Sequence, residues 1–319
     1  MKPSTDITVS VRAGKGTQWA LASKSFRRNW DLYLILIPVI AYFIIFKYIP
    51  MYGVQIAFRD FMATKGITGS PWAGFKHFRR FFDSYYFWRL LGNTLGISVY
   101  QLVAGFPVPI ILSLMINELR NKFLKKTAQL VTYAPHFLSV VVVVGMMSLF
   151  LSPQYGIVNK VIKFFGKEPI FFMAKPEYFK TLYVFSGIWQ NAGWDSIIYL
   201  AAIVGIDQEI YEAATVDGAS RFQKIWHVTL PGIMPTVIIL LILNSGRIMN
   251  VGFEKVFLMQ NNMNIDASDV ISTYVYRSGI LSAQYSFSAA VDLFNSVINC
   301  ILLVAVNTIS RKVSETSLW

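Results

Sequence analysis

Long apolar runs separated by polar segments dominate the pattern of the chain. Six such runs occupy residues 32–52, 90–116, 128–151, 181–204, 233–257 and 287–309. About twenty helical residues are enough to cross the roughly 30 Å hydrocarbon core of a bilayer. The pattern therefore predicts an all-α polytopic membrane protein with six transmembrane helices. We expect residues 31–312 to form its transmembrane domain, between a basic tail at 1–30 and a short C-terminal tail at 313–319.

Positive charges near the spans predict which side of the membrane each loop occupies. Arg12, Lys24 and Arg28 lie in the tail before the first apolar run, and residues 120–126 form a short basic turn. Lysine and arginine are enriched in cytoplasmic loops. We therefore expect both termini, the basic turn and residues 205–232 to be cytoplasmic.

Residues 53–88, between the first two runs, are rich in aromatic and arginine side chains. Aromatic rings and long arginine side chains favour the headgroup layer of a membrane. This segment is therefore expected to be an interfacial amphipathic piece. Residues 152–180 and 258–286 are the other expected outer loops.

Composition supports the membrane class. The chain is 55% hydrophobic and 14% charged, whereas about a quarter of the residues in a typical soluble domain are charged. Basic flanks of the spans account for the net charge of +12. The sequence has no basic stripe interleaved with aromatic residues, the pattern that would predict nucleic-acid binding. The single cysteine, Cys300, excludes an intrachain disulfide. His77, His136 and His227 are too dispersed to predict a metal or catalytic cluster.

Residues 205–235 form a polar island between the fourth and fifth runs, with the local signals of two short helices around a glycine turn. Asp207 is placed to cap the first helix, and Gly218 can end it in the left-handed conformation. Ser220 and Gln223 form an S-x-x-Q capping box for the second helix. A segment with this much local structure is more than a connecting loop.

The island resembles the EAA loop of importer-type ABC permeases, the membrane subunits of binding-protein-dependent transporters. The matching residues are Glu212-Ala213-Ala214, Asp217-Gly218-Ala219 and Val228-x-Leu230-Pro231. The resemblance implies that ATPase coupling falls to Glu212, Ala213, Ala214, Asp217, Gly218, Ala219, Leu230 and Pro231. The alternative interpretation is an amphipathic hairpin that lies on the bilayer surface.

A coupling loop must act as a short, stiff lever between a distant ATPase and a membrane helix. Ala213 and Ala214 allow close backbone approach, and Glu212 offers a charge to a basic partner. Pro231 removes slack at the junction with the fifth span. Pro231 and Pro235 are also expected in the first turn of that span, where the missing N–H of proline costs no hydrogen bond.

Further segments resemble the branch of the maltose-type permease family that imports oligo- and polysaccharides. They are Trp72 to Phe78, Asn93-Thr94, and Ile188 to Asp195 with Ile197 to Ala202. The match covers most of residues 30–312, and implies a type-1 ABC transmembrane domain in a bacterial cytoplasmic membrane. It implies four partners: a second homologous permease, two cytosolic ATPases and an extracytoplasmic solute-binding protein. ATP and Mg would bind to the ATPases, and this chain would be a transport subunit with no cofactor, not an enzyme.

A sugar pathway needs aromatic platforms for apolar C–H faces, beside amide and charged groups for hydroxyls. Polar residues inside spans generally face the bundle interior or a water-filled cavity. The candidates for the substrate pathway are Trp189, Gln190, Asn191, Trp194, Asp195, Tyr199, Asn244, Arg247, Asn250, Asp292, Asn295 and Asn299. The asparagines could instead form hydrogen bonds between helices, and the aromatic residues could be interface anchors or packing.

Arg247 has two interpretations. The helical rise places Asp195 and Asp292 at depths that a long arginine can reach, so the first is a buried ion pair. The second is recognition of an acidic sugar, because a guanidinium binds a carboxylate with two parallel hydrogen bonds.

The alternative function is an ion-coupled secondary transporter, in which Asp195 or Asp292 would carry protons. Gly14-Lys15-Gly16-Thr17 lacks the spacing of a phosphate loop, so ATP hydrolysis must come from another subunit. A membrane enzyme would need a catalytic cluster, and no such pattern occurs in the sequence.

Overall fold

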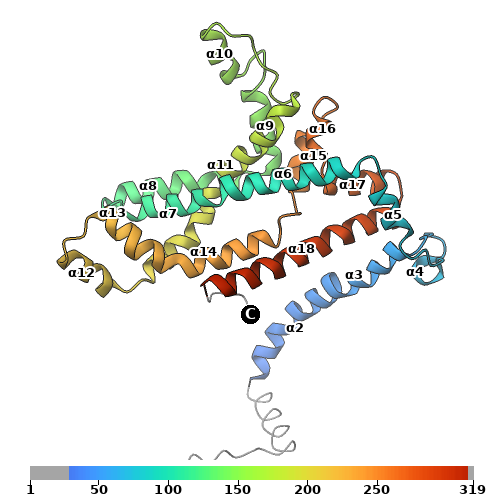
Figure 1. Ribbon diagram of the computed structural model, residues 1–319, viewed down its shortest axis with the longest axis horizontal. Helices are drawn as coiled ribbons and strands as arrows, with labels where there is room; N and C mark the ends of the chain where they lie inside the picture. The colour runs from blue at the N-terminus through green and yellow to red at the C-terminus, as the bar shows by residue number, and fades with distance from the viewer. Residues whose placement is uncertain (1–28, 315–319) are drawn as a thin grey trace, which may run out of the picture. The chain divides into compact units, whose positions relative to one another are not determined.

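The computed structural model describes residues 29–314, and every regular element in this range is a helix (Figure 1). The described residues contain isolated β-bridges but no strand. The chain divides into two compact units, Met1–Gln55 and Ile56–Trp319. The all-α prediction is confirmed. The basic tail expected at 1–30 lies almost entirely outside the described residues, as does most of the tail at 313–319.

The described part of the first unit is one helical stretch with no buried residue before Met51. Its elements are α2 (Trp30–Phe43), the π-helix η1 (Ile44–Tyr48), α3 (Ile49–Met51) and the 3₁₀ helix η2 (Tyr52–Phe58), whose last residues belong to the second unit.

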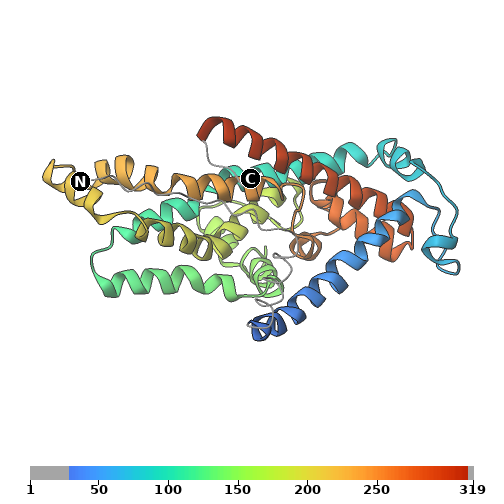
Figure 2. The ribbon, with the colours of Figure 1, turned by 90° about the horizontal axis from the view of Figure 1, so that it is seen from below.

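The second unit begins with short helices and continues with long ones. Its elements are α4 (Gly66–Gly69), α5 (Lys76–Phe82), α6 (Phe87–Gly105), α7 (Pro107–Asn117), α8 (Lys122–Tyr133), η3 (Ala134–Phe137), α9 (Val140–Phe150), α10 (Ile157–Phe164), α11 (Pro176–Val204), α12 (Gln208–Val216), α13 (Arg221–Lys224), η4 (Ile225–Thr229), α14 (Leu230–Ser245), α15 (Phe253–Met259), α16 (Ile265–Ser268), α17 (Ile271–Tyr276), η5 (Arg277–Leu281) and α18 (Tyr285–Ser314). Figures 1 and 2 place α12 and α13 at one end of the long helices and α5 at the other.

Four described helical stretches are long and apolar enough to cross a membrane: Trp30–Phe58, Phe87–Asn117, Arg221–Ser245 and Tyr285–Lys312. A fifth candidate is the bent pair of Lys122–Phe137 and Val140–Phe150. These stretches overlap five of the six predicted runs. The remaining run corresponds to α11, which has 29 residues but carries several polar side chains.

The third predicted span, at 128–151, is not one straight helix, which corrects the expectation. α8 passes into η3, and α9 then leaves at 99° to this first segment. Pro135 lies in η3 and lacks the N–H that a continuing helix needs, and the Ser139 side chain caps α9. The Leu138 carbonyl at the break accepts a hydrogen bond from Gln190 Nε2 at 2.9 Å. The run is apolar overall on both sides of Pro135, His136 and Ser139, so hydropathy alone does not reveal the break.

The fifth predicted span, at 233–257, also has different bounds in the structure. α13, η4 and α14 follow one another without a gap, so the helical stretch begins at Arg221 and ends at Ser245. Pro235 therefore lies inside α14 and not in its first turn, contrary to the expectation. The chain turns at residues 246–252 before α15 begins.

α11 is the central helix of the second unit and contacts α6, α7, α8, α14 and α16. Gly193 allows its close approach to α8, because a Cβ at this position would overlap the Thr132 carbonyl group. Any larger residue would push the two helices apart. The packing of α11 on α8 therefore depends on this glycine.

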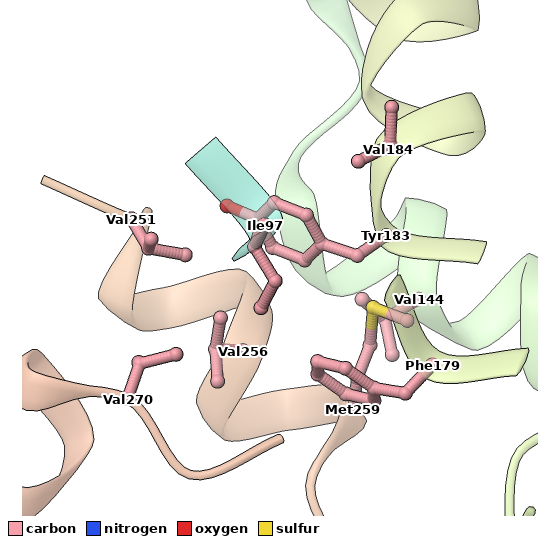
Figure 3. Close-up of a cluster of buried hydrophobic side chains, with 9 residues drawn as sticks. All are labelled: Ile97, Val144, Phe179, Tyr183, Val184, Val251, Val256, Met259 and Val270. Atoms are coloured by element: carbon pink, nitrogen blue, oxygen red, sulfur yellow. The ribbon is translucent and has the colours of Figure 1, made fainter. Parts of the chain in front are cut away.

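A buried apolar cluster joins α11 to the segment that follows α14 (Figure 3). Its members are Ile97, Val144, Phe179, Tyr183, Val184, Val251, Val256, Met259 and Val270. Within it, the Tyr183 hydroxyl accepts a hydrogen bond from the Gly252 N–H at 3.1 Å. The cluster thus fixes residues 251–256 against α11.

The segment expected to be amphipathic, residues 53–88, contains its own aromatic and ionic contacts. Phe58 stacks on Trp72 with 5.8 Å between the ring centroids. Lys76 Nζ lies 2.9 Å from Asp60 Oδ2, and the hydrogen bond from Lys76 lowers the pKa of Asp60 below its ordinary value. These contacts order the segment locally, and its position at a membrane surface stays a prediction.

Candidate translocation cavity and coupling loop

A cavity of about 510 Å³ lies between α6, α7, α11, α14 and the turn after α14. Six of the predicted pathway residues line it: Asn191, Asp195, Tyr199, Asn244, Arg247 and Asn250. The sequence interpretation missed Ser98 and Gln101 of α6, which also line the cavity. Both are polar residues inside a predicted span, so the signal that identified the later residues was present there too.

Arg247 lines the cavity from the turn after α14. Among the described residues the carboxylates that form ion pairs are Asp60, Asp266 and Asp269, and their partners do not include Arg247. The ion pair expected with Asp195 or Asp292 is therefore not formed, and that interpretation is wrong for this structure. The guanidinium remains free, within the described part of the chain, to contact a ligand.

Asparagine side chains hold the turn that carries Arg247. Asn295 Nδ2 and Asn299 Nδ2 donate to Asn250 Oδ1 at 3.1 and 3.0 Å. Asn299 Oδ1 also accepts a hydrogen bond from the Met249 N–H at 2.9 Å. Asn295 and Asn299 do not line the cavity, so α18 acts from behind its wall by fixing the turn.

His136, which was outside the predicted set, contacts the cavity wall from the break between α8 and α9. Its ring stacks on Trp194, with 4.5 Å between the centroids and 5° between the planes. His136 Nδ1 lies 3.0 Å from Asn191 Oδ1, and Asn191 Nδ2 donates to the Gly187 carbonyl at 3.1 Å. With the proton on Nδ1, His136 therefore orients the amide of a cavity residue.

The other predicted pathway residues lie away from the cavity. Trp189 is 50% exposed and Trp194 is 42% exposed, and Trp194 instead stacks on His136. Gln190 is buried at the break described above, where it binds the Leu138 carbonyl. Asp292 lies on α18 and is exposed. The structure therefore brings half of the predicted set together.

Lys255 is a further candidate that the sequence interpretation missed. It is only 8% exposed, and its Nζ donates to the Tyr183 carbonyl at 2.9 Å and lies 4.8 Å from the centroid of the Tyr183 ring. A Cβ on Gly187, which lines the cavity, would lie 3.3 Å from this Nζ. The ammonium group therefore lies directly behind the cavity wall, and it forms no ion pair among the described residues.

The loop between α11 and α14 has the local structure that the sequence predicts. Asp207 Oδ1 accepts a hydrogen bond from the Glu209 N–H at 3.0 Å and caps α12. Gly218 has φ +74°, the left-handed conformation that ends α12. Ser220 and Gln223 form the capping box, with distances of 2.8 and 3.4 Å. These local predictions are confirmed.

Side-chain hydrogen bonds across the loop make it stiff. The hydroxyl oxygens of Tyr211 and Thr229 are 2.9 Å apart, and Lys224 Nζ donates to Thr215 Oγ1 at 2.7 Å. These bonds tie α12 to α13 and η4. Because η4 leads directly into α14, these bonds also tie α12 to a candidate membrane span.

α12 presents an open surface at this end of the unit. Ile210 and Val216 are 51% and 88% exposed. Of the predicted coupling residues, Glu212, Ala213, Asp217, Gly218 and Pro231 are exposed, and Ala214, Ala219 and Leu230 are half-buried. The loop is thus free, within the described chain, to receive another protein.

The combination of long apolar helices, a polar-lined cavity and a stiff exposed loop defines the class of helical membrane transport subunits. Nothing in the described residues assembles three or more metal-ligating side chains.

Comparison with known proteins identifies the particular family. Residues 105–315 match the family model of the binding-protein-dependent transport system inner membrane component. The match covers more than half of the chain, so this protein belongs to that family. It is therefore a transport subunit of the permease type and not an enzyme, and the alternative of an ion-coupled carrier is set aside.

Close relatives extend the match to nearly the whole chain. Protein LplB of Bacillus subtilis is 45% identical over 97% of this chain and 96% of its own length. The polygalacturonan/rhamnogalacturonan transport system permease protein YteP, also of Bacillus subtilis, is 43% identical over 90% of each chain. A chain in the crystal structure of a bacterial alginate ABC transporter, in complex with a periplasmic protein bound to an alginate pentasaccharide, is 42% identical, with a TM-score of 0.84 over 92% of this chain and 99% of that one.

Proposed function

We propose that the chain forms half of the translocation pathway of an ATP-driven ABC importer for an acidic oligo- or polysaccharide. The names of the relatives support a polysaccharide substrate, and one similar solved transporter imports the acidic polysaccharide alginate. The observation that carries the acidic class is the unpaired Arg247 in the cavity. Lys255 behind the wall adds to the positive potential there.

Different cavity residues bind different groups of the sugar. Arg247 binds a uronate carboxylate, since a guanidinium offers parallel donors that match it. Asn191, Asn244 and Asn250 bind hydroxyl groups, and the buried Tyr199 forms part of the cavity wall behind them. Gln190, Trp194, Asn295 and Asn299 support the structure outside the cavity, and Trp189 and Asp292 lie outside it and are exposed.

The assembled importer contains a second homologous permease, two cytosolic ATPases and an extracytoplasmic solute-binding protein. ATP and Mg bind to the ATPases. The ATPases dock on the exposed coupling residues of α12 and of the turn that follows it. The stiffness of the loop supports this role, because a flexible loop would absorb the movement of the ATPases.

The chain crosses a bacterial cytoplasmic membrane six times, with α11 as the fourth span and both termini in the cytoplasm. Single cysteines at Val216 and Met263, which are 88% and 65% exposed, test this orientation in a Cys300→Ser background. An impermeant thiol reagent added from outside should label Met263→Cys and not Val216→Cys. Labelling of Val216→Cys alone would place the coupling loop on the wrong side.

The substrate class is tested by the ATPase rate of the assembled complex in nanodiscs with its binding protein. We expect stimulation by oligosaccharides of uronates, such as oligogalacturonate, and little by neutral maltodextrins of equal length. Equal stimulation by both would contradict the acidic class. Failure of every saccharide to stimulate, with a stable complex, would contradict the carbohydrate proposal.

A further inference from the structure

The surface of α10 carries an exposed apolar stripe that the function above does not use. Ile157, Val161 and Phe164 follow one another at i, i+4 and i+7, the spacing of one helix face. They are 62%, 52% and 86% exposed, and Phe165 at the end of the helix is 72% exposed. A stripe of this kind needs an apolar environment outside the described chain.

A row of lysines lies along one edge of this stripe. Lys160, Lys163 and Lys167 are all exposed, and none of them forms an ion pair among the described residues. At about 100° per residue Lys160 and Lys163 occupy one sector beside Phe164 and Ile157, and Lys167 follows the Gly166 turn just beyond the helix. The exposed half of the helix is therefore divided between an apolar sector and a basic sector.

The arm that carries α10 is held together from its opposite side. Asn159 is 1% exposed, and its amide donates to the carbonyls of Leu151, Ser152 and Ile170 at 2.9, 3.1 and 2.9 Å. Its Oδ1 accepts a hydrogen bond from the Ile170 N–H at 2.8 Å. Gly166, with φ +74°, ends the helix. The hydrogen bonds of Asn159 thus hold the arm together, and the apolar stripe stays exposed because it takes no part in this packing.

The direction of the arm fits a position along a membrane. α9 leaves α8 at 99°, and Figure 1 shows α9 and α10 projecting across the direction of α6, α7, α14 and α18. In Figure 2 the same arm is seen nearly end-on, so the two views agree. If the long helices cross the bilayer, the arm runs roughly along its plane, so the third crossing is made by α8 with η3 and not by α9.

We propose that α10 is an interfacial helix that binds anionic lipid. Its apolar stripe enters the acyl boundary by about 5–10 Å, the usual depth of such helices, and its lysines contact headgroup phosphates. This arrangement satisfies both sectors at once, whereas a purely apolar protein contact would leave the lysines without partners. The arm would then anchor the break between α8 and α9 to the lipid surface.

The depth of the helix is measured with a fluorescent label on Phe164→Cys in the Cys300→Ser background. The assembled transporter is placed in nanodiscs whose phosphatidylcholine carries a nitroxide on its acyl chain. We expect the label to be quenched several-fold more than the same label on Lys163→Cys, the matched control on the basic sector. Both positions are exposed, so neither change is expected to prevent folding.

The role of the lysines is measured by comparing two membranes. Nanodiscs of phosphatidylcholine alone are compared with nanodiscs of equal parts phosphatidylcholine and phosphatidylglycerol. Quenching at position 164 should increase with the anionic lipid, and the increase should be lost when Lys160, Lys163 and Lys167 are all changed to glutamine. An increase that survives the triple change would overturn the anionic-lipid assignment.

Two further outcomes would also overturn the proposal. In the first, the label at position 164 is quenched by aqueous iodide as strongly as the label at position 163, which places it in water. In the second, the label is shielded from both quenchers, either constantly or on addition of the binding protein. That result would assign the stripe to a protein partner.

Discussion

Two cationic side chains lie at one cavity without an anionic partner in the described chain. Arg247 lines the cavity, and the Lys255 ammonium lies behind the Gly187 position of its wall. Arg247 is exposed, and the buried Lys255 ammonium donates a hydrogen bond to the Tyr183 carbonyl. Arg247 is therefore open to a carboxylate on the transported sugar, and the charge of Lys255 favours an anionic group at the same place.

Replacing Arg247 by glutamine should lower the apparent affinity for a uronate oligosaccharide by about tenfold, because a hydrogen bond to a charged group is worth about 1.5–3 kcal/mol. Affinity for a neutral oligosaccharide of the same length should change little. The measurement is the KM of uptake for both sugars. Arg247→Lys is the matched control. Its KM for the uronate sugar should lie between the values for the unchanged chain and for Arg247→Gln, because lysine keeps the charge but loses the two parallel hydrogen bonds. An unchanged preference in Arg247→Gln would refute carboxylate recognition.

His136 should act through the orientation of Asn191. His136→Phe keeps a ring to stack on Trp194 but removes the hydrogen bond to the Asn191 amide. We expect a rise of severalfold in the KM for uptake, consistent with the loss of about 0.5–1.5 kcal/mol for one hydrogen bond. In an Asn191→Leu background the same change should have little further effect. Additive effects of the two changes would show that His136 has a separate, structural role.

At the scale of elements, the coupling loop depends on one glycine with a positive φ. Gly218→Asp should strain the end of α12 by about 1 kcal/mol, since side chains disfavour this conformation. It should also add a negative charge to the exposed surface of the loop. Retention of the ATPase subunits on the purified complex should fall, while the amount of membrane-inserted chain should not. Gly205→Ala, in the same loop at φ −77°, is the control that should bind normally.

Elements whose signals are local could be predicted from the sequence. The caps of α12 and α13 depend on residues two or three positions apart, so Asp207, Ser220 and Gln223 already define them. The break between α8 and α9 has local signals in Pro135 and Ser139, but an overall apolar run extends across them, and the partner that stabilises the break, Gln190, is far away in sequence.

The cavity was predictable only in part, for the same reason. Polar residues inside spans mark its wall, but their partners are distant: Asn191 meets His136 across 55 positions, and Asn250 meets Asn299 across 49. Sequence alone could not show that Asn299 supports the wall from behind while Asn250 lines it. Nor could it exclude an ion pair of Arg247, since that depends on packing in three dimensions.

At the scale of the molecule, the coupling loop and the cavity of the second unit lie at the two ends of α14. The coupling loop leads into α14, and the turn after α14 carries Arg247. Movement of α12 by an ATPase can therefore reach the residue proposed to hold the sugar through one continuous helical stretch of 25 residues. The chain supplies one half of such a pathway, and a homologous permease is proposed to supply the other.

Uptake by proteoliposomes tests this account most directly. The chain and its partner permease are reconstituted with or without the ATPase subunits, with the loaded binding protein outside and ATP and Mg inside the vesicles. We predict uptake of labelled uronate oligosaccharide only when the ATPases and ATP are both present, and none from an ion gradient alone. Uptake by the permeases without ATPases, driven by a proton or sodium gradient, would contradict the account.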